Sequence, residues 1–145
     1  MEFKASISIS QRPEKIWDFW LPVTTDVKWR GGINKAELTS KPPFGVGSTG
    51  IHYHDKLGPM PWTITKWEEG RHMEWVFGEC KIKGFYGFYH VEPENEMSRV
   101  TMQQTTPVLP FFMRIIMLFT GPIIKNSMKG DLKRLKAIME QQNVI

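Results

Sequence analysis

The sequence predicts an α+β fold with seven antiparallel strands, two short helices after the first strand and one long C-terminal helix. Two observations support this prediction. Between residues 33 and 106, short apolar runs alternate with Gly and Pro turn signals, which is typical of strands in a meander. After residue 110, the apolar spacing changes from a period of two to that of a helix.

The N-terminal segment is expected to begin with a half-buried strand. Over residues 2–10 apolar and polar side chains alternate, so that one face carries Phe3, Ala5, Ile7 and Ile9. Pro13 and Glu14 suit the first turn of a helix, which we expect over 13–20. A second short helix is expected over 25–29, because Gly31-Gly32 can end it.

Six further strands are expected between the turn-forming segments. Their ranges are 33–40, 48–54, 62–67, 72–77, 81–92 and 99–106. Because the connections are short, strands that follow one another in the sequence should pair antiparallel.

The last third of the sequence is expected to be helical to about residue 142. Residues 111–119 are apolar on nearly every side, so we expect them to cover an apolar cavity. Gly121-Pro122 should kink or break the helix. Beyond it, one stripe should pack against the sheet, formed by Ile124, Met128, Leu132, Leu135, Ile138 and Met139.

The composition narrows the class of protein. A length of 145 residues favours a single domain over residues 1–145. One cysteine, Cys80, excludes an intrachain disulfide, and the N-terminus lacks a signal-peptide pattern, so we expect a cytoplasmic location. The net charge of +4 arises from scattered lysines, and no nucleic-acid partner is expected. The apolar run 111–119 is too short to span a bilayer.

Aromatic residues are the most unusual feature of the composition. The chain contains six Trp, nine Phe, three Tyr and nine Met, which is more than a closed core of this size needs. A cavity with broad apolar walls would account for these large side chains. On the strand over 81–92, we expect Tyr89 to face inward, which leaves Tyr86 and Phe88 outward as a surface for a homodimer.

Several short motifs follow one another in a characteristic order. They are Ile7-x-Ile9, Pro13-Glu14-Lys15-Ile16-Trp17-Asp18-Phe19, Trp29, Gly45-Val46-Gly47-Ser48, the segment 67–75, Val91-Glu92-Pro93 before 98–101, and the segment 131–136. In this order the whole chain resembles the START-like (SRPBCC) superfamily, in its polyketide cyclase/dehydrase and lipid-transport branch. The resemblance implies a helix-grip fold, in which the sheet wraps around the long C-terminal helix and an apolar ligand cavity. It does not identify one function, because one fold hosts many.

The cavity is expected to be lined by large apolar side chains and by the amide of Gln104, which could orient a ligand. The expected set is Trp17, Trp29, Trp62, Met73, Trp75, Phe77, Phe85, Tyr89, Met102, Gln104, Phe112 and Ile116.

Four other polar residues and one arginine are candidates for metal binding, catalysis or ligand contact. His52 and His54 share a strand face, but nothing in the sequence brings a third metal ligand to them, so no metal site is expected. His72 and Glu74 are expected on the solvated face. Arg114 reaches either outward to solvent or inward to a ligand carboxylate.

The expected function is binding of a hydrophobic small molecule, such as a lipid, a polyketide or an isoprenoid-like compound, by a carrier or sensor. No acid–base constellation and no cofactor motif is recognisable, so catalytic residues remain unassigned. Two alternatives stay open. One is an enzyme of the polyketide cyclase/dehydratase type, and the other is an interaction module that sits on a membrane or a protein partner.

Overall fold

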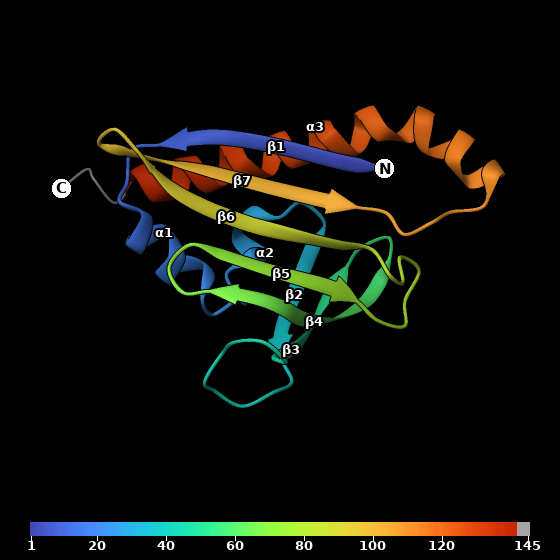
Figure 1. The fold of residues 1–145 in the computed structure, drawn as a ribbon, viewed down its shortest axis with the longest axis horizontal. Coiled ribbons are helices and arrows are strands. Elements are labelled where there is room, and N and C mark those ends of the chain that lie inside the picture. The colour runs from blue at the N-terminus through green and yellow to red at the C-terminus, as the bar shows by residue number, and fades with distance from the viewer. Residues whose placement is uncertain (142–145) are drawn as a thin grey trace.

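Side-chain alternation builds a single curled sheet. The computed structural model describes residues 1–141 and places the strands in the order β1-β7-β6-β5-β4-β3-β2, with every neighbouring pair antiparallel (Figure 1). The bounds are β1 Glu2–Ile9, β2 Ile33–Leu38, β3 Thr49–His54, β4 Gly58–Glu68, β5 His72–Phe77, β6 Tyr86–Glu94 and β7 Met97–Thr105. The first strand closes the meander by pairing with the last.

Three helices accompany the sheet. Two short ones, α1 (Pro13–Trp20) and α2 (Asp26–Trp29), connect β1 to β2, and α3 (Phe111–Gln141) follows β7. In Figure 1, α3 runs behind β1, and α2 lies behind the central strands. The predicted helix-grip architecture is therefore confirmed.

Two strands start four or five residues away from the predicted position, whereas the other starts agree within two residues. β4 begins at Gly58 rather than at residue 62, because Gly58 and Pro59 still pair with His54 and Tyr53 of β3. β6 begins at Tyr86 rather than at residue 81. The preceding residues form turns instead, with Gly84 at a φ of 81°, a backbone conformation that glycine adopts without steric cost.

The C-terminal half of α3 closes the core. Met128, Leu132, Leu135 and Met139 are buried against the inner face of the sheet, each no more than 3% exposed. They recur at intervals of three and four residues and so lie on one side of the helix. Ile124 and Ile138 are half-buried against the same core, so the predicted stripe is confirmed.

The N-terminal half of α3 bends as predicted but does not cover a cavity. Pro122 lies inside one continuous helix, so the helix bends but does not break (Figure 1). Gly121 is buried where a Cβ atom would lie 3.0 Å from the ring of Phe3, which explains a glycine there. Residues 111–119 do not cover a cavity: Phe112 and Ile116 are 64% and 54% exposed.

A close packing of Trp62 on a glycine determines the shape of the inner face. Gly50 pairs with Trp62 across β3 and β4, and a Cβ at Gly50 would lie 2.2 Å from Cζ2 of the indole. Any side chain at this position therefore displaces Trp62.

We expect Leu135→Ala to destabilise the protein by about 2–5 kcal/mol, because Leu135 is fully buried and its truncation leaves a cavity. Leu118→Ala, in the same helix at 66% exposure, should change the free energy of unfolding by no more than about 0.5 kcal/mol. Urea denaturation measures both values. A similar loss at the two positions would contradict the packing of α3.

Gly50→Ala should lower the free energy of unfolding by about 1–3 kcal/mol, because the added methyl group overpacks against Trp62. Gly45→Ala is the matched control, since no atom lies within 4 Å of a Cβ at Gly45. Equal stability of the two variants in urea would show that Trp62 does not pack on residue 50 as described.

Candidate functional site

The inner face of the sheet borders two cavities that share Arg30 and Phe77. The inner cavity, between α2 and the strands β3 to β6, has a volume of only about 30 Å³. That is room for one or two water molecules. The outer pocket lies between the sheet and α3 and has a volume of about 360 Å³, which is within the range for small-molecule sites.

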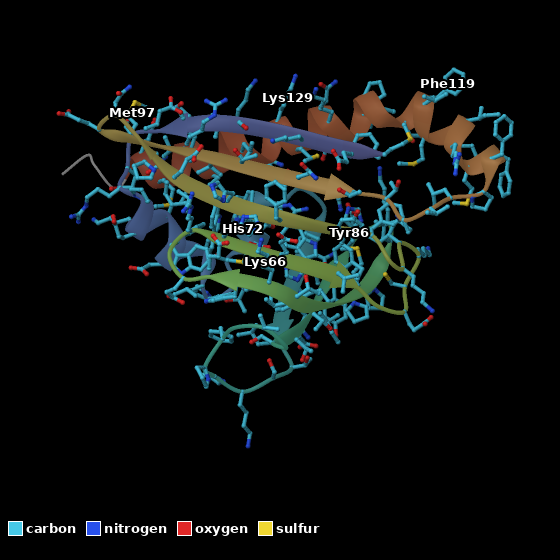
Figure 2. The ribbon with its side chains drawn as sticks, in the orientation of Figure 1. Lys66, His72, Tyr86, Met97, Phe119 and Lys129 are labelled. Atoms are coloured by element: carbon cyan, nitrogen blue, oxygen red, sulfur yellow. The ribbon has the colours of Figure 1, made fainter. Side chains whose placement is uncertain are left out.

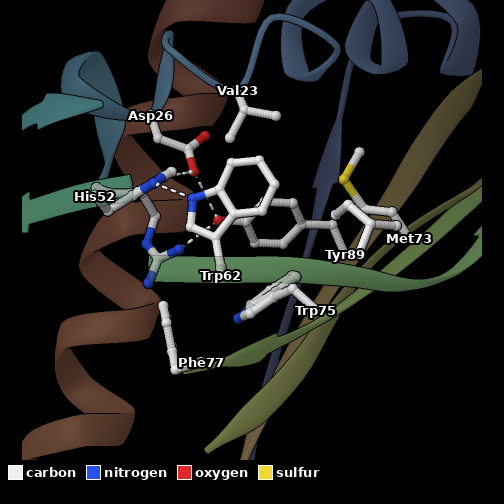
Figure 3. A pocket seen from close by; sticks show the side chains of 10 residues that line it. Val23, Asp26, His52, Trp62, Met73, Trp75, Phe77 and Tyr89 are labelled. Atoms are coloured by element: carbon white, nitrogen blue, oxygen red, sulfur yellow. Dashed lines mark hydrogen bonds and ion pairs between the residues drawn. The ribbon is translucent and has the colours of Figure 1, made fainter. Parts of the chain in front are cut away.

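The walls of the inner cavity are mainly aromatic, with a polar group at one side (Figure 3). Trp62, Trp75, Phe77 and Tyr89 come from three neighbouring strands and face the same space. The Trp75 and Tyr89 rings lie 4.5 Å apart between centroids, at a tilted angle that aromatic pairs favour.

Asp26 is the centre of the polar group. It is 2% exposed, and three donors satisfy its carboxylate. Trp29 Nε1 donates to Oδ1 at 3.1 Å, and Tyr89 Oη donates to Oδ2 at 3.1 Å. His52 Nε2 lies 2.9 Å from Oδ2. Burying a carboxylate is costly unless its oxygens are hydrogen-bonded, and these three donors meet that need.

The hydrogen bonds of His52 define its tautomer. Trp62 Nε1 lies 2.7 Å from His52 Nδ1, and an indole nitrogen can only donate, so Nδ1 accepts. The hydrogen is therefore on His52 Nε2, which donates a hydrogen bond to Asp26 Oδ2. Both ring nitrogens are thus engaged, Nδ1 as an acceptor and Nε2 as a donor (Figure 3).

Arg30 connects this group to α3. Burial opposes its charge, but Tyr89, Asp131 and Asp26 stabilise the cation more strongly and raise the pKa of the guanidinium above its ordinary value. Its Nη1 donates to Tyr89 Oη, and its Nε contacts Asp131 Oδ2 at 3.1 Å. Arg30 therefore remains a cation at the boundary between the two cavities.

Tyr89 is a neutral phenol in this network. Burial raises its pKa well above 10, and the nearby Asp26 carboxylate adds to that rise against the opposing effect of Arg30. The phenol can therefore accept from Arg30 and donate to Asp26 at the same time.

Asp131 attaches α3 to the segment after α2. Its carboxylate accepts from the Gly31 backbone N–H at 2.9 Å and contacts both Arg30 and Arg134. Arg134 Nε also donates to the Trp29 carbonyl at 2.9 Å. Two carboxylates and two guanidiniums thus balance in charge, and the network extends from β4 to α3.

The outer pocket has mostly apolar walls. Phe85 and Leu57 come from the strand connections, and Ile124 and Met128 come from α3. Gln104 of β7 supplies an amide, and Arg30 with Asp131 supplies charge at one end. This is an amphipathic site, with an apolar body and a charged inner end.

The structure divides the predicted cavity residues into three groups. Seven line one of the two cavities: Trp62, Met73, Trp75, Phe77, Tyr89, Phe85 and Gln104. Three are buried in the core and line neither of them: Trp17, Trp29 and Met102. Phe112 and Ile116 are exposed on α3, because that half of the helix extends past the sheet.

The charged residues of the site were not predicted. Asp131 carried a signal, because it lies between Met128 and Leu132 within the buried stripe of α3, where a lone charge needs a partner. Asp26 and Arg30 lie in and after a four-residue helix and carry no comparable pattern. The sequence around His52 suggests only a metal ligand, because its spacing to His54 is the one local pattern it belongs to.

The other polar candidates lie outside the Asp26 network, although His54 borders the outer pocket. His54 Nδ1 contacts Asp55, and His72 Nε2 contacts Glu74 at 2.7 Å on the outer face. Arg114 is exposed, and its Nε donates to the Leu109 carbonyl. In the part of the chain that the structure describes, no three His, Cys, Asp or Glu side chains gather as metal ligands. Nor does any helix within residues 1–141 have the length and apolar character needed to cross a membrane.

We expect Asp26→Asn to lower the free energy of unfolding by about 1.5–3 kcal/mol, because an amide offers one acceptor oxygen to three buried donors. Asp18→Asn, on the exposed side of α1, is the matched control and should be near neutral. Thermal or urea unfolding compares the two. If Asp26→Asn were as stable as the control, the carboxylate would not organise the network.

Solved structures with similar folds cover nearly the whole chain. XoxI from Bacillus cereus has a TM-score of 0.74 at 18% identity, over 99% of each chain. The Aha1 dimer from Colwellia psychrerythraea has a TM-score of 0.70 at 18% identity, over 97% of this chain and 96% of that one. The di-domain ARO/CYC StfQ from the steffimycin biosynthetic pathway has a TM-score of 0.79 at 11% identity, over 99% of this chain and 52% of its own.

These similarities establish the fold, and a match to a family model establishes the family. No curated protein matches the sequence. The model described as "Polyketide cyclase / dehydrase and lipid transport" matches residues 1–140. The match includes every strand, the buried network and nearly all of α3. The chain therefore belongs to the polyketide cyclase/dehydrase and lipid transport family.

Proposed function

We propose that this protein binds a hydrophobic small molecule, of the lipid, polyketide or isoprenoid-like class, as a carrier or sensor. The outer pocket is the observation that carries the proposal. It combines a volume of about 360 Å³ and mainly apolar walls with a charged end at Arg30 and Asp131. Sites of this size with a few oriented polar groups are typical of small-molecule binding.

The charged end favours a ligand with an acidic or oxygen-rich head. Arg30 uses Nε for Asp131 and Nη1 for Tyr89, and within residues 1–141 no partner occupies Nη2. A guanidinium donor at a pocket wall suits a carboxylate or a carbonyl oxygen. Gln104, on β7, can contribute an amide to the same pocket.

The inner cavity supports the outer pocket rather than extending it. With room for one or two waters, it cannot admit a lipid chain or a ring system. Its aromatic walls and polar network hold Arg30 in place from behind. The site that we propose for the ligand is therefore the outer pocket, between α3 and the sheet.

Cyclase or dehydratase activity is the second candidate. It is favoured by the family and by the border of the inner cavity, where His52, Asp26 and Tyr89 offer acid–base groups. Against it, both nitrogens of His52 and both oxygens of Asp26 are already hydrogen-bonded. A proton-transfer group needs an open position toward its substrate, so binding without chemistry fits the geometry better.

We expect a fluorescent fatty-acid or naphthalene-type dye to bind with saturation and to be displaced by apolar compounds. Ser127→Trp should weaken dye binding at least about tenfold, because residue 127 borders the outer pocket and an indole would fill it. Asn126→Trp, one residue earlier on an exposed part of α3 and outside this pocket, is the control. Equal dye affinity in the two variants would place the ligand elsewhere, and no binding of any apolar probe would contradict the proposal.

The role of Arg30 predicts a preference among ligands of equal length. A fatty acid should compete with the dye roughly 10- to 100-fold better than the corresponding fatty alcohol, because only the carboxylate forms a charge-assisted hydrogen bond. Competition titration measures the ratio. Equal potency of acid and alcohol would remove Arg30 from ligand recognition.

A further inference from the structure

The N-terminal half of α3 presents an apolar surface to solvent. Between residues 111 and 123, six large apolar side chains are each more than half exposed, namely Phe111, Phe112, Ile116, Leu118, Phe119 and Ile123. We refer to residues 111–123 as the apolar tip. A contiguous apolar surface of this kind on a folded protein marks an interaction site.

The apolar tip faces away from the rest of the protein. Figure 1 shows this half of α3 extending beyond the sheet, and Figure 2 shows Phe119 on the outer side of the helix. Gly121 lies on the opposite side, against Phe3. One helical turn later the outward side becomes polar, with Asn126 and Lys129 exposed. The change of character along one face shows that the exposure is specific to the tip.

The charges along the chain segment that contains the apolar tip have a single sign. Residues 106–130 contain Arg114, Lys125 and Lys129 and no Asp or Glu. All three cations are exposed, and none has a carboxylate partner within residues 1–141. Exposed apolar side chains flanked by cations are the pattern of a helix that lies in the surface of an anionic membrane.

We propose that the apolar tip docks on an anionic lipid bilayer, with its aromatic and aliphatic side chains in the interfacial region and its cations against the headgroups. A second copy of the chain is a poorer occupant. A two-fold contact would place the same patch against itself, and would bring the cations of one copy against those of the other. Anionic headgroups instead complement them.

The apolar tip adjoins the outer pocket, which relates bilayer docking to ligand binding. Ile123 lies in the tip and also borders the outer pocket, and Ile124 continues that wall. A docked tip would thus bring the pocket to the membrane surface. The docking itself does not depend on the pocket having a ligand, so the inference goes beyond the proposed function and is tested separately.

Co-sedimentation with vesicles of phosphatidylcholine, with and without phosphatidylglycerol, tests the proposal. The protein should bind the vesicles that contain phosphatidylglycerol and lose that binding at high salt. The double variant Phe112→Asp/Phe119→Asp should bind at least about tenfold more weakly, because two apolar contacts become charges near anionic lipid. Val46→Asp, at 70% exposure in the loop between β2 and β3, should bind as the unsubstituted protein does.

The cations have a matched test. Lys125→Gln/Lys129→Gln should weaken binding to phosphatidylglycerol vesicles at least about fivefold, whereas Lys28→Gln/Lys41→Gln removes two exposed lysines elsewhere and should have little effect. Circular dichroism and dye binding in solution, unchanged in all variants, show that the fold and the pocket are intact.

Three results would overturn the docking proposal. The first is that the protein does not bind anionic vesicles. The second is that the Phe112→Asp/Phe119→Asp variant binds them as well as Val46→Asp does. The third is that the protein forms a dimer in sedimentation velocity, that the Phe112→Asp/Phe119→Asp substitutions dissociate this dimer, and that neither protein binds vesicles. The last result would assign the apolar tip to a second copy.

Discussion

The buried ion pair between Arg30 and Asp131 is the interaction on which the rest of the site depends. It joins the segment after α2 to the middle of α3, with the two charged atoms 3.1 Å apart and the Asp131 side chain 5% exposed. Burying these charges is costly unless every polar atom finds a partner. Tyr89 and the Gly31 backbone supply partners to the pair, and Asp26, His52 and Trp62 extend the network. Within residues 1–141, Nη2 of Arg30 has no partner. The directional bonds of this network connect α3 to the segment after α2 and, through Tyr89, to the sheet, at one end of the outer pocket.

The same constraint explains why an apolar cavity persists in a protein so rich in large side chains. Leu132 and Leu135 hold the C-terminal half of α3 on the sheet by burial. One turn closer to the N-terminus of the helix, the contact between α3 and the rest of the protein is the Arg30–Asp131 ion pair. Both residues also line the outer pocket, which extends from this pair toward the N-terminus of α3. The helix thus has three parts along its length: a packed anchor, a pocket wall and an apolar tip. Each part corresponds to a different pattern of apolar residues.

Most of the fold could be predicted from periodicity, whereas the polar half of the site could not. Alternation in β1 and the i, i+3, i+4 stripe of α3 are local patterns, so they identified the sheet and the packed half of the helix. Trp62, Trp75 and Tyr89 were expected in the cavity because their strand faces are apolar. The contacts of Asp26, His52 and Asp131 join residues up to 101 positions apart, and no local pattern reports such pairings. The expectation that residues 111–119 cover a cavity was wrong for a related reason. An apolar run in the sequence does not show whether its side chains contact the rest of the protein or a surface outside it.

The central claim is that a ligand lies between α3 and the sheet with its polar head at Arg30. Nuclear magnetic resonance of the protein, with labelled methyl groups and arginine Nε–H groups, tests this claim most directly during titration with a fatty acid. The account predicts saturable shifts of the Arg30 Nε–H signal and of the Ile124 and Met128 methyl signals, with no change at Ile9 in the distant core. Shifts confined to the exposed Phe111–Phe119 segment, or none near Arg30, would contradict it.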